Sequence, residues 1–318
     1  MLIFVQILLL IVGFAILIKG ADYLVDGASN LALNFKVPKI LIGLTVVAFG
    51  TSAPELAVSI KALSSGHSDM VLGNVIGSNI MNILLILGVA AAIHTIKMRR
   101  RTIRKELPIC LLISVLLVVL MLDRQLAGAD TNYFSRADGI TVVLFFTVFL
   151  YNLVRSAFRK RKKQEEKPDY GVMKAIFLII VGLVGVVLGS NMVVDAAKII
   201  AQVMGVSERV ISLTIIAFGT SLPELVTTIV AAKKGEQDLL VGNIIGSNIF
   251  NIAVVLGIPS IIFGGVDVAS VSRIDMIAFV VAAAVLMGFA LHRKELDRKE
   301  GVLMLLIFAT YYSYVALA

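Results

Sequence analysis

Apolar residues along the chain gather into ten long runs separated by short polar stretches. The runs cover residues 2–18, 38–63, 70–95, 107–122, 138–154, 172–190, 208–232, 239–263, 274–291 and 301–317. A helix that crosses a bilayer needs about 20 predominantly apolar residues, with a range of roughly 17–25. No segment shows the alternating pattern of a transmembrane β-strand. The pattern therefore predicts an all-α membrane protein with ten transmembrane helices.

Composition strengthens this prediction. Apolar residues make up 59% of the 318 positions, charged residues make up 16%, and the mean hydropathy is +0.98. Soluble domains average about 45–50% apolar and about 25% charged residues. The first run lacks the basic leader and cleavage site of a signal peptide, so we expect a retained helix. The single cysteine, Cys110, excludes an internal disulfide and is expected to be a buried thiol.

The net charge of +8 reports topology rather than nucleic-acid binding. Alternate loops hold 22 of the 29 Lys and Arg residues, including the runs at 97–101 and 159–163, whereas the opposite loops hold 6. Because basic loops stay in the cytoplasm, both termini are predicted to lie outside it. The run at 159–163 could bind anionic lipid or a partner. A role as a topology anchor explains this basic run without a bound lipid or a partner.

The chain contains an internal repeat at an offset of 169 residues. Residues 43–88 align without a gap on residues 212–257, and 25 of the 46 positions are identical. The shared strings GTSxPE and GNxIGSNIxN are polar, so membrane composition does not explain them. The boundaries predicted are a first repeat at 1–155, a short basic cytoplasmic loop at 156–171 and a second repeat at 172–318. Since five helices per repeat is an odd number, the two repeats are expected to be inverted, as in many secondary transporters.

GTSxPE places one carboxylate, Glu55 or Glu224, inside an apolar run of each repeat. An ionisable residue there costs about 2.5–3.5 kcal/mol on insertion scales. The preceding residue, Pro54 or Pro223, has no N–H to donate, so each helix is predicted to break at this string. Carbonyl groups and hydroxyls then join the carboxylate in an all-oxygen site. The hydroxyls belong to Thr51, Ser52, Thr220 and Ser221.

The second string adds neutral oxygens at a spacing of four, which places them on one helix face. These residues are Asn74, Ser78 and Asn82 in the first repeat and Asn243, Ser247 and Asn251 in the second. Its glycines also form small-xxx-small helix-packing patterns, and both interpretations can hold. For Asn79 and Asn248, packing between helices is at least as plausible as ion binding.

The chemistry points to a hard cation. Calcium takes 6–8 oxygen ligands, and the three scattered histidines offer no zinc or copper site. Two carboxylates balance one divalent ion or two sodium ions. A buried structural carboxylate paired with a lysine is the alternative, but Lys61 has no counterpart, because position 230 is Val. No enzyme motif is present, and no cofactor is expected.

These two strings, AFGTSAPE with GNVIGSNIMN and AFGTSLPE with GNIIGSNIFN, resemble the signature repeats of the calcium:cation antiporter superfamily. The likeness is to the sodium/calcium exchanger family, in particular the small YrbG-type bacterial calcium/sodium antiporters. It covers nearly the whole chain. It implies the exchanger fold of ten helices, in which the first and sixth helices slide across a rigid core, and a location in a bacterial or archaeal inner membrane.

The resemblance also implies roles for individual residues. Glu55 and Glu224 are implied to bind both calcium and sodium, Thr51 and Thr220 to contribute carbonyls, and Asn82 and Asn251 to occupy the central position. The flanking sodium positions are implied to be Ala48, Ser52, Ser78, Ala217, Ser221 and Ser247. Asparagine at 251, where potassium-dependent relatives carry aspartate, leans against a potassium requirement.

The function expected is sodium/calcium exchange by alternating access. The transported calcium and sodium ions and membrane lipid are the expected partners, and a functional monomer is expected, with no nucleic acid. A calcium/proton antiporter is the nearest alternative, since protons could compete for the carboxylates. A cation channel is a further alternative, although channels more often repeat around a pore in several subunits.

Overall fold

The computed structural model describes residues 2–126, 128–159, 166–206, 215, 217–269 and 271–317. The described part of the chain is helical apart from four two-residue strands. Its first half contains α1 (Leu2–Phe35), α2 (Lys39–Ile42), η1 (Gly43–Val47), α3 (Ala48–Thr51), α4 (Ala53–Ser64), α5 (Asp69–Ile80), η2 (Met81–Leu87), α6 (Gly88–Ile93), β1 (Ile96–Lys97), α7 (Arg100–Arg104), α8 (Glu106–Leu120), α9 (Asp123–Leu126), β2 (Tyr133–Phe134) and α10 (Arg136–Arg159). The second half contains α11 (Val172–Val203), α13 (Ala217–Thr220), α14 (Leu222–Lys233), α15 (Gln237–Phe250), η4 (Asn251–Leu256), α16 (Gly257–Phe263), β3 (Val266–Asp267), α17 (Arg273–Arg293), β4 (Glu295–Leu296) and α18 (Arg298–Leu317). The elements labelled η are π-helical.

Six helical segments among the described residues are long and apolar enough to cross a membrane. They are Ile3–Phe35, Met70–Ile93, Arg136–Ser156, Val172–Val203, Gln237–Phe263 and Arg273–Arg293. A seventh candidate is the pair Lys39–Thr51 and Ala53–Ser64, bent by 45° at its break. Of the predicted run 208–232, residues 208–214 and 216 lie outside the described part, as does the basic stretch 160–163.

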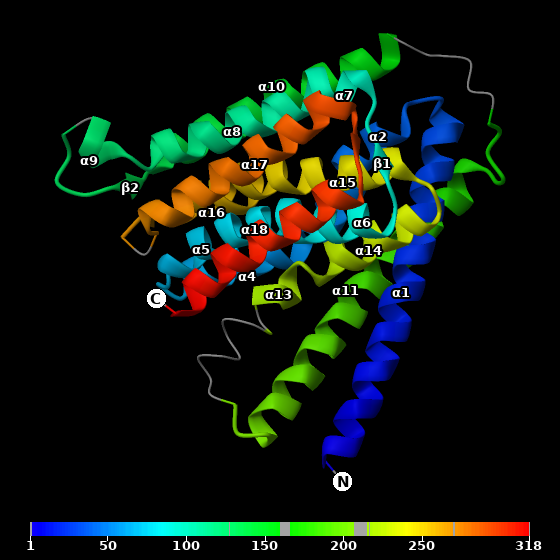
Figure 1. Ribbon diagram of the computed structural model, residues 1–318, viewed down its shortest axis with the longest axis horizontal. Helices are drawn as coiled ribbons and strands as arrows, with labels where there is room; N and C mark the ends of the chain where they lie inside the picture. Colours follow the sequence, from blue (N-terminus) through cyan, green and yellow to red (C-terminus); the bar gives the residue numbers. More distant parts are fainter. Residues whose placement is uncertain are drawn as a thin grey trace.

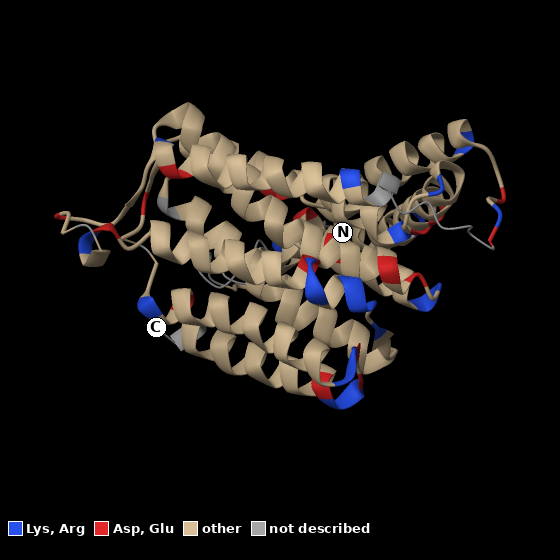
Figure 2. Cartoon of the chain, turned by 90° about the horizontal axis from the view of Figure 1, so that it is seen from above, with Lys and Arg blue, Asp and Glu red and all other residues tan. Residues whose placement is uncertain are grey.

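The outer surface is apolar in the way a lipid-facing surface must be. Phe4 on α1 is 73% exposed and Met173 on α11 is 80% exposed, and both belong to rows of exposed apolar side chains. A soluble monomer rarely exposes such continuous patches. Lys, Arg, Asp and Glu gather mainly toward the two ends of the helices, with a largely uncharged band between them (Figure 2). The protein is therefore an all-helical membrane protein, as predicted.

The centre of the molecule is formed by the two segments that carry the second repeated string. Of the most apolar 18 residues of each segment, 72% are buried in Met70–Ile93 and 100% in Gln237–Phe263, against 22% in Ile3–Phe35 and 28% in Val172–Val203. Polar residues in the two central segments are thus enclosed by protein, which is the condition for irregular or polar backbone at membrane depth.

The two longest helices, α1 and α11, lie side by side and extend obliquely beyond the other helices (Figure 1). Their backbones approach closely at glycines: a methyl group on Gly20 would lie 2.6 Å from the Val186 nitrogen, and one on Gly182 would lie 2.5 Å from the Leu24 nitrogen. Both helices continue well past the predicted ends at residues 18 and 190. Helix α1 thereby includes the charged residues Asp22 and Asp26, which form ion pairs with Lys234.

Two short antiparallel strand pairs connect the halves of the chain. In one pair, Ile96 of β1 faces Leu296 of β4, and in the other, Phe134 of β2 faces Val266 of β3. Strands β1 and β2 lie toward opposite ends of the molecule (Figure 1). Each half therefore contributes one strand to each pair, which holds the halves together at both ends.

The start of α18, next to β4, is stabilised by a side-chain cap. Asp297 Oδ1 accepts hydrogen bonds from the backbone amides of Glu300 and Lys299, and Glu300 Oε2 accepts one from the Asp297 amide. The reciprocal bonds satisfy amides that the first helical turn leaves unpaired. The backbone amide of Glu300 is the main group that holds the pKa of Asp297 below its usual range.

Candidate cation site

Each GTSxPE string breaks its helix, as predicted. Helix α3 ends at Thr51 and α4 starts at Ala53, with Ser52 between them at φ −86° and ψ 8°. In the second half α13 ends at Thr220 and α14 starts at Leu222, and Ser221 has almost the same backbone angles, −89° and 5°. The two breaks carry the same residues in the same conformation.

The break leaves carbonyl groups without their helical partners. Pro223 cannot donate to the carbonyl of Gly219, which instead accepts a hydrogen bond of 3.1 Å from the Ser190 hydroxyl on α11. Pro54 releases the carbonyl of Gly50 in the same way. Ala21, the α1 residue that corresponds to Ser190, has no hydroxyl to donate.

Glu55 and Glu224 are both fully enclosed, at 1% and 0% exposure. Each accepts a hydrogen bond from the serine of the opposite half. Ser52 donates to Glu224 Oε1 at 2.8 Å, and Ser221 donates to Glu55 Oε1 at 3.4 Å. Ser247 also reaches Glu224 Oε1, at 3.5 Å. The serines therefore tie the two broken helices to each other through the carboxylates.

Neither glutamate forms an ion pair with a lysine, arginine or histidine of the described chain. Lys61, the one basic residue near either string, is largely exposed at the far end of α4. An uncompensated buried charge is very costly. The arrangement therefore calls for a cation from outside the protein.

Four asparagines in the central segments hold one another across the halves. Asn79 donates to the carbonyl of Asn248 at 3.1 Å, and Asn248 donates to the carbonyl of Asn79 at 3.4 Å. Their side-chain oxygens accept the amide groups of the other two: Asn82 donates to Asn248 Oδ1 at 3.0 Å, and Asn251 donates to Asn79 Oδ1 at 3.1 Å. Packing of Asn79 and Asn248 between helices, one of the two predicted roles, is confirmed.

This network fixes which way Asn82 and Asn251 point. Because the amide nitrogen of each is engaged, its oxygen is turned the other way and remains free. The side-chain oxygens that are buried without a hydrogen-bond partner include Glu55 Oε2, Glu224 Oε2, Asn82 Oδ1 and Asn251 Oδ1. They form two pairs of corresponding atoms, one pair of carboxylate oxygens and one of amide oxygens. Such orphaned acceptors call for a donor or an ion from outside the protein.

Both amide oxygens lie where the central helices change geometry. The π-helical segment η2 begins one residue before Asn82, and η4 begins at Asn251 itself. Single π-helical turns inside α-helices occur frequently at functional sites. These π-helical turns were not predicted from the sequence.

Asn74 and Asn243, which were predicted to offer oxygens to an ion, also contact the broken helices. Asn74 donates to the carbonyl of Glu55 at 3.1 Å and to Ser59 Oγ at 3.2 Å. Asn243 Oδ1 accepts the Thr51 hydroxyl at 3.1 Å. Both asparagines therefore hold the broken helices in place, and Ser59, which sequence analysis did not single out, is a partner in this contact.

The remaining predicted residues are placed in different ways. Ser52, Ser221 and Ser247 contact the glutamates, and Ser78 is buried. The carbonyl of Ala48 accepts the Ser52 amide at 3.1 Å and the Thr51 hydroxyl at 3.4 Å. Ala217 begins α13, Thr220 ends it, and the side chain of Ala217 lies outside the described part.

The predicted glycine packing is found in the second half. A methyl group on Gly242 would lie 2.8 Å from the Ile40 carbonyl, and one on Gly246 would lie 2.8 Å from the Ala48 side chain. For Gly73 and Gly77, no described atom lies within 4 Å of such a group. The chain segment that corresponds to their partners, residues 209–213, lies outside the described part.

The site is made only of oxygen ligands. Among the described residues no group of three or more His, Cys, Asp and Glu side chains comes together. Carboxylate, amide, hydroxyl and carbonyl oxygens suit calcium, magnesium or sodium rather than zinc or copper. Buried carboxylate and amide oxygens of this kind can replace part of the water shell of such an ion.

Comparisons with known proteins agree with this chemistry. The family model described as "Sodium/calcium exchanger protein" matches residues 5–155 and 174–317. The inner membrane protein YrbG of Escherichia coli (strain K12) is 42% identical over 276 residues, which cover 83% of this chain and 82% of YrbG. The sodium/calcium exchanger MaX1 of Methanosarcina acetivorans is 33% identical over 341 residues, covering 96% and 97% of the two chains.

A solved structure extends the likeness to the whole fold. The sodium-calcium exchanger NCX_Mj, soaked with 10 mM Na⁺ and zero Ca²⁺, matches with a TM-score of 0.85 and 32% identity over 99% of both chains. A buried, oxygen-lined site at the centre of an all-helical membrane protein is the design of a cation transporter. The chain belongs to the sodium/calcium exchanger protein family, whose members are antiporters rather than enzymes.

Proposed function

We propose that this protein exchanges sodium for calcium across the cytoplasmic membrane, through one site that the two ions share. The observation that carries the proposal is the set of four unpartnered oxygens on Glu55, Glu224, Asn82 and Asn251. These oxygens are buried, and neither glutamate forms an ion pair with a described residue. A transported cation is therefore the natural partner of the two carboxylates.

The proposed ligands are those that the resemblance implies, and the contacts of Glu55 and Glu224 with Ser52, Ser221 and Ser247 support them. Glu55 and Glu224 bind both ions, and the amide oxygens of Asn82 and Asn251 complete the centre of the site. Thr51 and Thr220 contribute main-chain carbonyls. The flanking sodium positions are formed by Ala48, Ser52, Ser78, Ala217, Ser221 and Ser247. The ions are cargo, and the proposal requires no cofactor.

The proposed architecture is two inverted five-helix repeats, at 1–155 and 172–318, joined by a basic cytoplasmic loop at 156–171. The reciprocal bonds between Asn79 and Asn248 support it, as does the crossed pairing of Ser52 and Ser221 with the glutamates. With the positive-inside distribution of Lys and Arg, this places both termini outside the cytoplasm.

Movement of α1 and α11 against the central helices provides alternating access in this proposal. The two helices pack on each other through glycine contacts, so they can move as a pair. Charge sets the condition for movement: one calcium ion or two sodium ions neutralise the carboxylates, whereas the empty site keeps an uncompensated charge in a low dielectric. Ion-loaded states therefore exchange sides and the empty state does not. The sodium gradient then expels calcium from the cytoplasm.

Flux through vesicles tests the proposal. The purified protein is reconstituted with sodium inside, and uptake of radioactive calcium is followed after dilution into sodium-free buffer, with the proton gradient collapsed by an ionophore. We expect uptake that saturates with calcium and depends on internal sodium. Calcium uptake that is absent in this assay but appears when an imposed proton gradient replaces the sodium gradient would show a calcium/proton antiporter. Flux without any counter-ion would show a channel. Either result refutes the proposal.

A further inference from the structure

A cavity lined by α7, α8 and α10 shares no residue with the cation site. Its volume is about 500 Å³, large enough to admit a polar group of several heavy atoms. It lies beside the basic stretch that includes Arg100 and Arg104, at the start of α8 and near the end of α10. Nothing in the exchange mechanism uses it.

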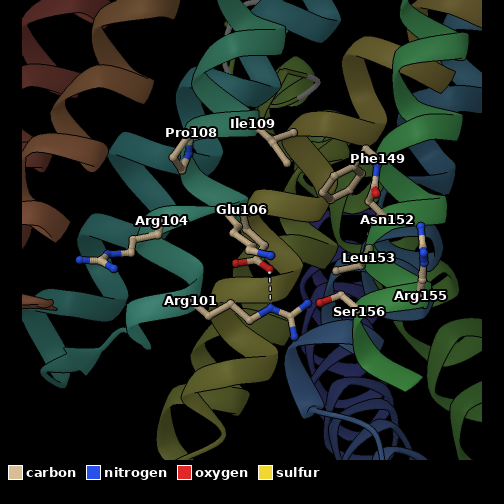
Figure 3. A pocket seen from close by; sticks show the side chains of 11 residues that line it. Arg101, Arg104, Glu106, Pro108, Ile109, Phe149, Asn152, Leu153, Arg155 and Ser156 are labelled. Atoms are coloured by element: carbon tan, nitrogen blue, oxygen red, sulfur yellow. Dashed lines mark hydrogen bonds and ion pairs between the residues drawn. The ribbon is translucent and has the colours of Figure 1, made fainter. Parts of the chain in front are cut away.

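The lining of this cavity changes from charged to apolar along the helices. Arg101 and Arg155 are close to the loop end, whereas Ile109 and Phe149 lie further along α8 and α10 (Figure 3). Four cationic side chains, the two arginines together with Arg104 and Lys105, line the cavity against a single carboxylate, Glu106. The cavity is therefore net positive, with an apolar floor on the membrane side.

The carboxylate serves to hold one of the cations in place. Glu106, whose side chain is 3% exposed, accepts a hydrogen bond of 3.2 Å from Arg101 Nε. The two terminal nitrogens of the Arg101 guanidinium make no hydrogen bond within the described part of the chain. They reach toward the middle of the cavity, near Ser156 on α10 (Figure 3). A guanidinium fixed in this way presents the fork that matches a phosphate group.

The other cations are also available to a ligand. Arg104, Lys105 and Arg155 form no ion pair with the described residues. The guanidinium of Arg155 lies 6.0 Å from the centre of the Tyr151 ring, a contact that leaves its N–H groups free. Four arginine and lysine side chains grouped at a membrane-facing cavity repel one another unless an anion joins them.

We propose that this cavity binds the phosphodiester group of an anionic phospholipid. Arg101 and Arg155 contact the phosphate from opposite helices, Arg104 and Lys105 add long-range attraction, and the acyl chains leave along Ile109 and Phe149. Basic pockets between helices near the membrane surface are suited to lipid head groups. The apolar floor favours a lipid over a free phosphate ester, and the excess positive charge favours an anionic head group over a zwitterionic one.

Native mass spectrometry of the full-length protein in detergent measures this binding. The probes are phosphatidylglycerol, phosphatidylethanolamine with the same acyl chains, and glycerol 3-phosphate. We expect phosphatidylglycerol to be retained in preference to phosphatidylethanolamine, and glycerol 3-phosphate not to displace it. Equal retention of the two lipids, or displacement by glycerol 3-phosphate at comparable concentration, would overturn the proposal.

Variants place the lipid in this cavity. Arg155→Gln removes one cation without disturbing the Arg101–Glu106 pair, and Arg104→Gln removes another. Arg155→Gln should weaken phosphatidylglycerol retention about fivefold, since one basic side chain near a lipid surface contributes about this much. Arg104→Gln, which removes only long-range attraction, should weaken it less. Arg100→Gln, one residue before Arg101 and outside the lining, is the charge-matched control and should have little effect. A loss with Arg100→Gln as large as with Arg155→Gln, or no loss with Arg155→Gln and Arg104→Gln, would show that no such site exists.

Discussion

Asn79 and Asn248, 169 positions apart, each donate a side-chain hydrogen bond to the main-chain carbonyl of the other, at 3.1 and 3.4 Å. The pair joins α5 to α15 at the centre of the molecule. Its side-chain oxygens also hold the amides of Asn251 and Asn82. Asn79 and Asn248 are not proposed as ligands themselves. They orient Asn82 and Asn251, which are.

Substitution of Asn79 or Asn248 by alanine should therefore weaken calcium binding without removing a ligand. The amide of the neighbouring asparagine loses its acceptor and rotates, so its oxygen no longer faces the site. Loss of an orienting contact typically costs about 10–100-fold in metal affinity. Calcium binding by isothermal titration measures the effect. Asn132→Ala, in an exposed loop, is the control, and unchanged affinity in Asn79→Ala and Asn248→Ala would contradict the orienting role.

Glu55→Gln and Glu224→Gln should each abolish exchange while the fold is retained. Glutamine has the same shape and keeps an oxygen acceptor for the opposite serine, but the site loses the charge that balances the ion. Sodium-driven calcium flux in vesicles measures activity, and size-exclusion behaviour and thermal unfolding report on folding. Glu295→Gln, at a surface strand, serves as the control. Normal flux in either buried variant would remove these residues from the site.

The contact between α1 and α11 should not tolerate even one methyl group. At Gly182 the added carbon would lie 2.5 Å from the Leu24 nitrogen, so Gly182→Ala must push the helices apart. We expect a loss of stability of about 1–3 kcal/mol, as for other overpacked contacts, together with impaired flux. Gly288 on α17 has open space around it, so Gly288→Ala should be neutral or mildly stabilising. Equal unfolding temperatures for the two variants would contradict this description.

Lys234 connects α1 to the turn between α14 and α15. Its amino group lies 3.0 Å from Asp22 Oδ1 and 2.7 Å from Asp26 Oδ1. The corresponding residue of the first half is Ser65, so the clamp exists on one side only. If α1 moves during transport, the clamp must open, and Lys234→Gln should then raise the exchange rate by up to about fivefold, the range of a partly exposed ion pair. Lys233→Gln is the adjacent control, and identical rates for both variants would show that the clamp does not limit transport.

The helix breaks and the buried glutamates of the site could be predicted from neighbouring residues in the sequence. The breaks at Ser52 and Ser221 follow directly from the proline two residues later, and the burial of Glu55 and Glu224 follows from their apolar runs. The π-helical turns at Asn82 and Asn251 were not predicted, because the same residues favour α-helical and π-helical backbone alike.

Other features depend on contacts between distant segments. The ends predicted for α1 and α11, at residues 18 and 190, were too early. In α1, the charged residues beyond the predicted end, Asp22 and Asp26, have partners elsewhere in the chain. Lys234 is one such partner, more than 200 residues from Asp26. Likewise, the spacing of the GNxIGSNIxN string shows that its asparagines share a face, but it does not show that the amide group of Asn74 donates to α4.

Competition between the two ions at one site is the central claim, and equilibrium calcium binding in increasing sodium tests it most directly. The account predicts that sodium raises the apparent dissociation constant of calcium while the number of bound calcium ions stays the same, and that Glu55→Gln and Glu224→Gln lose both calcium binding and its sodium dependence. Sodium that lowers the number of calcium ions bound without changing the dissociation constant, or that has no effect at all, would contradict a shared site.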